Sequence, residues 1–139
     1  MPIDHIALTT KDIVKLAAFY EAALKPLGYA ERFSFVDGAV RGLGPENGPA
    51  DLWLSSLPPS KIPPGFEDLP VGAWSGPLHI AFKAETKEQV HAFYEAALAF
   101  GASDNGAPGP RQAINTEYAA FVFDPDGRNI EVNYVTPKA

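Results

Sequence analysis

Two parts of the chain show the same order of hydrophobic and polar positions. Residues 3–9 alternate between apolar and polar side chains, which is typical of a strand with one buried face. Over residues 11–27 the apolar positions recur with the period of a helix and form one stripe, made by Ile13, Leu16, Tyr20 and Leu24. Gly28 follows this stripe, as expected just beyond the end of a helix. The pattern predicts a strand followed by a helix.

The second part lies 74 residues further along the chain. Residues 78–83 alternate again, and Thr86 and Gln89 have the spacing of a capping box that starts a helix ending near Gly101. When residues 5–24 are aligned with residues 79–98, ten of the twenty positions are identical. The identities include the opening His-Ile-Ala and the closing Ala-Phe-Tyr-Glu-Ala-Ala-Leu. The chain therefore contains an internal repeat.

Strand and turn signals follow each predicted helix. The first copy has an Asp37-Gly38 hairpin turn and a second turn around Asn47-Gly48. The second copy ends in a hairpin with Asp126-Gly127 at its tip. We therefore predict an α+β chain made of two βαβββ modules, at residues 1–56 and 79–137.

A proline-rich connector, residues 57–78, joins the two modules. It holds six of the chain's fourteen prolines, and we expect it to add no strand to either sheet. It could be a passive spacer. A loop of this length in a compact domain is, however, more often functional, and Phe66 and Trp74 give it side chains that can pack as a lid or a wall.

Composition narrows the classes of function. The chain has 139 residues and no cysteine, which excludes disulfides and thiolate metal sites. Its net charge of −6, with no Lys/Arg cluster, argues against nucleic acid as a partner. No apolar run approaches the roughly 20 residues that a membrane helix needs, and no signal peptide is visible. We expect a cytoplasmic protein without a membrane partner.

Two histidines and one glutamate share the polar face of their predicted strands. His5 and His79 are repeat mates, and each lies opposite the aliphatic residues of its strand; Glu131 does the same in the last strand. Two imidazoles and one carboxylate form a set that binds Fe(II), and it is compatible with Zn, Mn, Co or Ni. Polar strand residues facing solvent are the alternative. The third histidine, His91, is expected at the surface of the second helix.

Paired "HIA" strands, two βαβββ modules and the "FDPDGRNIEV" hairpin resemble the vicinal oxygen chelate superfamily. That superfamily includes glyoxalase I, extradiol dioxygenases and bleomycin-resistance-type binding proteins. The resemblance covers essentially the whole chain. It implies a curved mixed sheet around a central cleft, with the helices outside, in one domain. It also implies that His5, His79 and Glu131 bind one divalent ion, that Glu131 is catalytic, and that the chain forms a homodimer.

The sequence departs from the superfamily pattern at two positions. Trp53 lies 78 residues before Glu131 and is its counterpart in the first copy. It stands where glyoxalase I-like proteins usually have a glutamate or glutamine as a fourth ligand, although Asp51 lies on the same strand face. Phe121 stands where extradiol dioxygenases usually have a tyrosine acid, and Tyr118 should face the other way. An aromatic cleft wall would suit a planar or apolar substrate. The expected substrate-binding residues are Trp53 and Phe121, with Lys83 and Arg111 for an anionic group, the last in the predicted loop "GAPGPRQ".

Two functions remain open at this point. The first is a metal-dependent isomerase, lyase or dioxygenase acting on a small substrate with adjacent oxygens, because the two histidines and the glutamate are retained. The second is a metal-free protein that binds or sequesters a small molecule, which the acidic charge would suit if the ligand is cationic.

Overall fold

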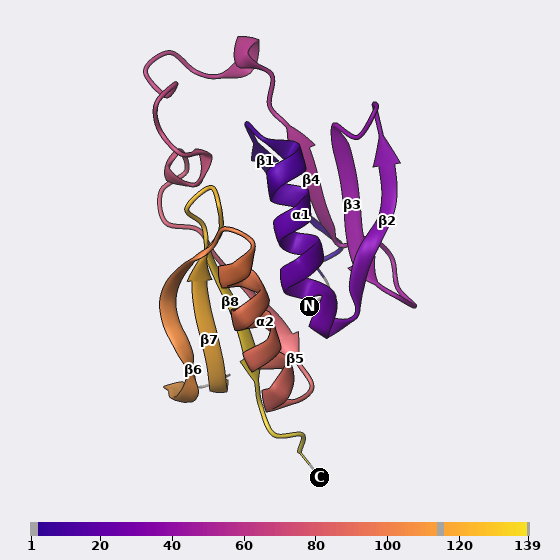
Figure 1. The fold of residues 1–139 in the computed structure, drawn as a ribbon, viewed down its shortest axis with the longest axis vertical. Helices are drawn as coiled ribbons and strands as arrows, with labels where there is room; N and C mark the ends of the chain where they lie inside the picture. Colours follow the sequence, from indigo (N-terminus) through magenta and orange to yellow (C-terminus); the bar gives the residue numbers. More distant parts are fainter. Residues whose placement is uncertain (1–2, 114–115, 139) are drawn as a thin grey trace.

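The computed structural model describes residues 3–113 and 116–138 and contains the two predicted βαβββ modules (Figure 1). The first module consists of β1 (Ile6–Thr10), α1 (Ile13–Leu24), β2 (Tyr29–Phe35), β3 (Val40–Pro45) and β4 (Leu52–Ser56). The second consists of β5 (His79–Ala84), α2 (Lys87–Ala99), β6 (Ser103–Ala113), β7 (Thr116–Phe123) and β8 (Asn129–Tyr134). The α+β fold class predicted from the sequence is confirmed.

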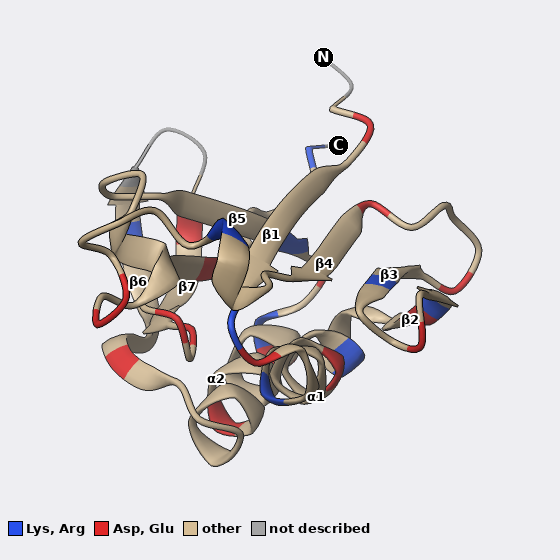
Figure 2. Cartoon of the chain, turned by 90° about the horizontal axis from the view of Figure 1, so that it is seen from above, with Lys and Arg blue, Asp and Glu red and all other residues tan. Residues whose placement is uncertain are grey.

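Each module has its own four-stranded mixed sheet. The strand orders are β1-β4-β3-β2 and β5-β8-β7-β6, so the first strand of each module pairs in parallel with its last strand and the other pairs are antiparallel. Viewed from above, α1 and α2 lie together on one side of the two sheets (Figure 2). The sheet faces that carry the candidate site residues are turned away from the helices.

Local sequence signals fix the ends of both helices. The side chain of Asp12 accepts a hydrogen bond from the Lys15 amide at 3.0 Å and caps α1. Thr86 and Gln89 form both bonds of the predicted capping box on α2. Gly28, with a φ of +83°, takes the left-handed conformation beyond α1 that residues other than glycine rarely adopt.

The strand alternation predicted from the sequence is also present. Along β5, Ile80 and Phe82 are buried while His79, Ala81 and Lys83 are exposed. Leu8 of β1 and Ile130 of β8 belong to a core cluster that draws buried residues from both modules. Burial of this aliphatic face therefore turns the histidine-bearing face away from the core.

One prediction about the second module is wrong. The segment "GAPGPRQ" was expected to be a loop, but it forms part of β6. β6 is the edge strand of its sheet, where a proline costs no ladder hydrogen bond on the open side. Its pairing with β7 is irregular, with shifts in register between Asp104 and Ala113. Arg111 is thereby carried on a strand that pairs with the strand of Phe121.

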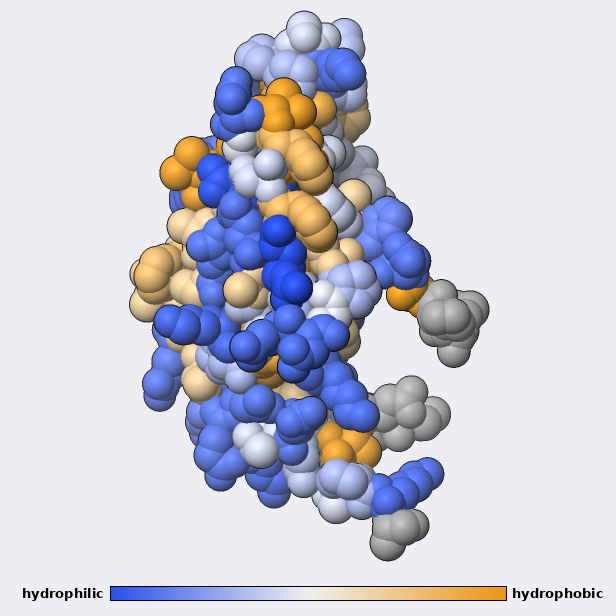
Figure 3. Space-filling model, turned by 90° about the vertical axis from the view of Figure 1, so that its right-hand side faces the viewer, coloured by the Kyte–Doolittle hydropathy of each residue, from blue (hydrophilic) through white to orange (hydrophobic). Residues whose placement is uncertain are grey.

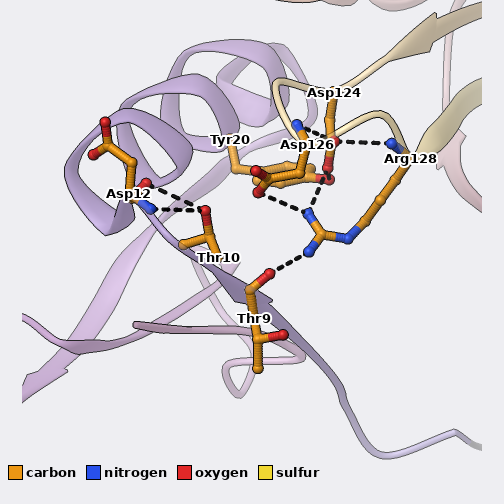
Figure 4. Close-up of polar contacts among 7 residues, drawn as sticks. All are labelled: Thr9, Thr10, Asp12, Tyr20, Asp124, Asp126 and Arg128. Atoms are coloured by element: carbon orange, nitrogen blue, oxygen red, sulfur yellow. Dashed lines mark hydrogen bonds and ion pairs between the residues drawn. The ribbon is translucent and has the colours of Figure 1, made fainter. Parts of the chain in front are cut away.

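The modules are linked by a buried polar cluster at the β7–β8 hairpin (Figure 4). Asp124 accepts hydrogen bonds from Tyr20 of α1 at 2.6 Å and from the Arg128 guanidinium at 3.0 Å. Arg128 also donates to the backbone oxygen of Thr9 in β1 and to Asp126. Burial and the adjacent Asp124 carboxylate raise the pKa of Tyr20 well above its usual value. The hairpin of the second module therefore binds both β1 and α1 of the first module.

The connector, residues 57–78, contains no strand and only two 3-10 turns, η2 (Pro59–Lys61) and η3 (Val71–Ala73). Lys11 donates to the backbone oxygens of Glu67 and Leu69, at 2.5 and 3.0 Å. The backbone amide of Gly72 donates to the backbone oxygen of Asp126 at 2.9 Å. A Cβ at Gly72 would lie 2.4 Å from that backbone oxygen, so only glycine fits there. The connector is therefore docked on both modules. No helix in the described part of the chain is long and apolar enough to cross a membrane.

Candidate functional site

His79 and Glu131 meet on the open face of the second sheet. His79 begins β5, and Glu131 lies on the neighbouring parallel strand β8, opposite Ala81. The imidazole Nε2 is 2.8 Å from Glu131 Oε2. Only 6% of Glu131 is exposed, and its second oxygen accepts from Thr116 and Asn133, each at 3.3 Å. Three polar partners therefore hold this buried carboxylate in place.

Two asparagines orient His79 from its other side. Asn129 is the register partner of His79, and its amide nitrogen lies 2.8 Å from His79 Nδ1. Asn105 of β6 donates to the Asn129 side-chain oxygen at 3.1 Å. With Nδ1 accepting from the amide, Nε2 carries the proton that points to Glu131. Sequence reasoning missed both asparagines, although Asn129 stands in the "RNIEV" segment that supplied Glu131.

Phe121 and Arg111, two of the predicted substrate-binding residues, stand beside this pair. Phe121 is the register partner of Glu131 on β7, and its ring packs edge-on against His79 with centroids 5.8 Å apart. The Arg111 guanidinium lies 5.4 Å from the centre of the Phe121 ring. A cation next to an aromatic wall can hold an anionic group of a ligand.

A pocket of about 500 Å³ opens next to His79. The connector forms one wall with Gly76 and Pro77, and Phe123 forms another. Asn105 and Asn129 also line the pocket, so His79 is reached from a mainly apolar space with two amides. This volume lies within the range of small-molecule sites, about 300–1,000 Å³.

His5 and Lys83, which were predicted to share the site, lie apart from the His79–Glu131 pair. The His5 side chain is 53% exposed, and its Nδ1 lies 2.5 Å from the carboxylate of its neighbour Asp4. Lys83 lines a pocket of about 230 Å³ together with His5, Tyr29 and Asp51. Within the described ranges, no three His, Cys, Asp or Glu side chains form a group that could hold a metal ion.

The predicted match between Trp53 and Glu131 is visible in the strand register. Trp53 pairs with Ala7 as Glu131 pairs with Ala81, and these two alanines are repeat mates. Trp53 packs with Phe33 and Phe35 of β2, away from Phe121. The two predicted aromatic walls thus belong to separate modules.

Asp51, considered above as a substitute ligand, is engaged elsewhere. Its Oδ2 accepts from the Tyr29 hydroxyl at 2.9 Å. Burial, together with this contact, raises the pKa of Tyr29. Its Oδ1 is buried without a partner in the described part of the chain. Tyr118 faces α2, as expected, and lies 2.6 Å from His91.

A known protein family matches almost the whole chain. The family model described as Glyoxalase/Bleomycin resistance protein/Dioxygenase superfamily matches residues 2–132. The chain belongs to this superfamily. No curated protein sequence matches it.

Solved structures of the same superfamily share the fold. A glyoxalase/bleomycin resistance protein from Albidiferax ferrireducens T118 is 22% identical, with a TM-score of 0.70 over 96% of this chain and 98% of its own. A glyoxalase/bleomycin resistance protein/dioxygenase family enzyme from Burkholderia phytofirmans PsJN is 25% identical, with a TM-score of 0.66 over 95% and 97%. A glyoxalase-related enzyme from Fulvimarina pelagi is 19% identical, with a TM-score of 0.65 over 96% and 88%.

A metal ion is the cofactor that the superfamily implies, and two of the three predicted ligands suit one. Donor atoms that share a metal at about 2.0–2.2 Å stand about 3 Å apart, close to the 2.8 Å between His79 Nε2 and Glu131 Oε2. A histidine that ligates through Nε2 carries its proton on Nδ1, so Asn129 can serve as the usual outer partner only after its amide turns its oxygen, in place of the nitrogen, toward His79. His5 belongs to the other sheet, where its ring contacts Asp4, and it does not join this pair in the structure.

Proposed function

We propose that this chain is a metal-dependent enzyme of the glyoxalase/dioxygenase type that acts on a small substrate with two adjacent oxygens. His79 and Glu131 supply two ligands to one divalent ion, and His5 supplies the third once it releases Asp4. The ion is one of Fe, Zn, Ni, Co or Mn. The observation that carries the proposal is the buried carboxylate of Glu131.

A buried carboxylate needs a cation or strong hydrogen-bond donors. Asp124, the other deeply buried acid, has both in Arg128 and Tyr20. In the described part of the chain, the only ion-pair partner of Glu131 is His79, which is charged only when protonated. A divalent ion bound between Glu131 and His79 would compensate the negative charge of the carboxylate at every pH at which the imidazole is neutral.

The groups around the pair have distinct roles in such an enzyme. A bound ion supplies Lewis-acid polarisation of a substrate oxygen. Glu131 binds either the ion or a proton through Oε2. The Asn105–Asn129 pair fixes the rotation of the His79 ring. Phe121 and Arg111 form an apolar wall with one cation, which suits a substrate with an anionic group. The pocket beside His79 admits a small molecule.

A metal-free binding protein is the second candidate, and two observations favour it. The His5 ring is turned to Asp4, and Trp53 is packed among phenylalanines where a fourth ligand would stand. Under either function we propose a small-molecule ligand and a homodimer.

Elemental analysis of protein purified without a histidine tag separates the two candidates. We expect about one divalent ion per chain in the wild type and a loss of most of it in His79→Ala. His91→Ala is the matched control, because it removes an exposed helix histidine, and it should keep the ion. If the wild type is metal-free as purified and after dialysis against each of the five ions, the result would favour the metal-free binding protein.

A further inference from the structure

A pocket of about 290 Å³ lies where the connector meets β1 and the β7–β8 hairpin, and it is here called the connector pocket. Its lining residues are Ala7, Leu8 and Thr9 of β1, Val71, Gly72, Trp74, Ser75 and Leu78 of the connector, and Arg128 of the hairpin. Arg128 is the only charged residue among them. Both modules and the segment that joins them therefore contribute to one pocket.

Trp74 brings a buried hydrogen-bond donor to this pocket. Its indole Nε1 is buried and has no hydrogen-bond partner in the described part of the chain. Neighbours fix the ring, since Phe66 packs edge-on with centroids 5.8 Å apart and the Lys11 ammonium lies 5.6 Å from the ring centre. A buried N–H without an acceptor destabilises a fold. The indole therefore favours an acceptor that comes from outside the protein.

Arg128 brings further donors, and its side chain is only 3% exposed. A guanidinium has five N–H groups. Nη1 donates to Asp124 and to Asp126, and Nη2 donates to the backbone oxygen of Thr9 (Figure 4). Within residues 3–113 and 116–138, the Nε–H and the second N–H of Nη2 have no partner. Nε and Nη2 share one edge of the planar guanidinium, so one acceptor can bind both.

The connector pocket differs from the apolar residues that reach the surface elsewhere. Seen from the side of β2 and β3, apolar residues stand among hydrophilic ones (Figure 3). Scattered apolar residues of this kind are normal on a folded protein. Apolar walls combined with buried donors are instead typical of a site for a small molecule.

We propose that the connector pocket binds a small, neutral molecule through a carbonyl oxygen of the amide or urea type. The oxygen accepts hydrogen bonds from Trp74 Nε1 and from the free edge of Arg128. The apolar part of the molecule contacts Leu8, Val71 and Leu78, which line the same pocket. Each donor that lacks a partner in the protein is thereby paired.

Charge selects a neutral molecule. Asp124 and Asp126 already contact the guanidinium, at 3.0 and 3.2 Å, so two carboxylates surround one cation and would repel an anion. The chain's net charge of −6 acts in the same direction. A cation would meet Arg128, and no Asp or Glu is among the lining residues to bind it. A carbonyl oxygen accepts hydrogen bonds without bringing a charge.

The connector pocket shares a wall with the pocket beside His79, because Gly72 and Leu78 line both. A bound molecule would hold this wall in place. The binding itself needs neither a metal ion nor the His79–Glu131 pair. It is therefore tested independently of the proposed function.

The two tryptophans of the chain allow a direct test by NMR. They give two indole N–H signals, and Trp53→Phe identifies the signal of Trp74. Titration with 2-piperidone, a neutral cyclic amide, should move the Trp74 signal downfield to saturation, with a dissociation constant on the order of millimolar. Piperidine, a cation of the same ring size without a carbonyl, should leave the signal in place. Cyclopentanecarboxylate, an anion of similar size, should bind severalfold more weakly.

Variants locate the site, with affinity measured on the signals of 2-piperidone. Ala7→Leu adds three carbons to the pocket lining and should weaken binding about tenfold or more. Ala81→Leu is the matched control, because Ala81 is the exposed repeat mate of Ala7 and does not line this pocket. Trp74→Phe removes the indole donor and should weaken binding about three- to tenfold, whereas Trp53→Phe should not.

Three results would overturn the proposal. The first is a Trp74 signal that does not approach saturation at about 100 mM 2-piperidone, which would show that the free donors bind water only. The second is an equal affinity in Ala7→Leu and Ala81→Leu, which would place the binding elsewhere. The third is tighter binding of cyclopentanecarboxylate than of 2-piperidone, which would refute a neutral ligand.

Discussion

Trp53 and Glu131 occupy the same position in the two copies of the repeat. Each stands on the last strand of its module, opposite an alanine of the first strand, and those alanines are 74 residues apart. One copy therefore presents a carboxylate beside a histidine, while the other presents an indole. The chain therefore has one candidate ligand set, in the second module, and one aromatic surface, in the first.

Trp53→Glu should increase the affinity for a divalent ion severalfold. The substitution places a carboxylate opposite Ala7, on the face that carries His5, and so adds an anionic ligand to the proposed set. Calorimetric titration with Zn(II) and Ni(II) measures the effect. Trp53→Gln is the control for loss of the indole, and an equal affinity in the two variants would count against the expected role of position 53.

Gly42→Ala should destabilise the fold by about 1–3 kcal/mol, because the added Cβ overlaps the Trp53 ring. Gly109→Ala is a matched change within a strand, where the nearest atom is the flexible end of Arg111 at 3.3 Å, and it should cost less. Urea unfolding compares the two. Equal losses would mean that the indole does not lie over Gly42.

Asp124→Asn should cost about 3–5 kcal/mol of unfolding free energy, because it leaves the buried Arg128 charge with only the more exposed Asp126 carboxylate as its partner. Tyr20→Phe removes one hydrogen bond to that carboxylate and should cost about 1.5–3 kcal/mol. Asp126→Asn changes a more exposed partner of the same guanidinium and should cost the least. A different order in chemical denaturation would show that this cluster does not hold the modules together.

Stability should fall at alkaline pH through Tyr20. Its pKa is raised in the folded chain, so the neutral phenol contributes stability that is complete below the unfolded pKa of about 10 and is lost as the pH rises toward the folded pKa. Tyr20→Phe should therefore lose less stability than the wild type between pH 9 and 11. Parallel decline of the two proteins over that range would contradict the assignment.

The chain should be a homodimer in solution, as we propose above from the resemblance to the superfamily. Light scattering at tens of micromolar should report about twice the 14.9 kDa of one chain. A mass of one chain at that concentration would refute it.

Local patterns in the sequence predicted most of the fold. The repeat and the strand alternation predicted the modules and the face of each strand, and the 78-residue offset predicted the match of Trp53 with Glu131. The position of Phe121 beside Glu131 also follows from counting along the hairpin. These features depend on periodicity within one segment, which a sequence shows directly.

Features that depend on register between distant segments were not predictable in this way. The bulge after Glu31 turns Phe33 to the open face, although simple alternation places it with Tyr29. The sequence places Asp124 in the "FDPDGRNIEV" hairpin but does not show that it accepts a hydrogen bond from Tyr20, 104 positions earlier. His5 and His79 are repeat mates but belong to separate sheets, and no strand pattern specifies how the two sheets are placed.

Anomalous diffraction from crystals grown with a divalent ion tests the central claim most directly. The ion should give one strong peak within about 2.0–2.2 Å of His79 Nε2 and a Glu131 oxygen, with the His5 ring turned from Asp4 toward it. Crystals of Glu131→Gln grown under the same conditions should lose most of the peak. A peak remote from His79 and Glu131, or none at an ion concentration of several millimolar, would contradict the proposal of a metal-dependent enzyme.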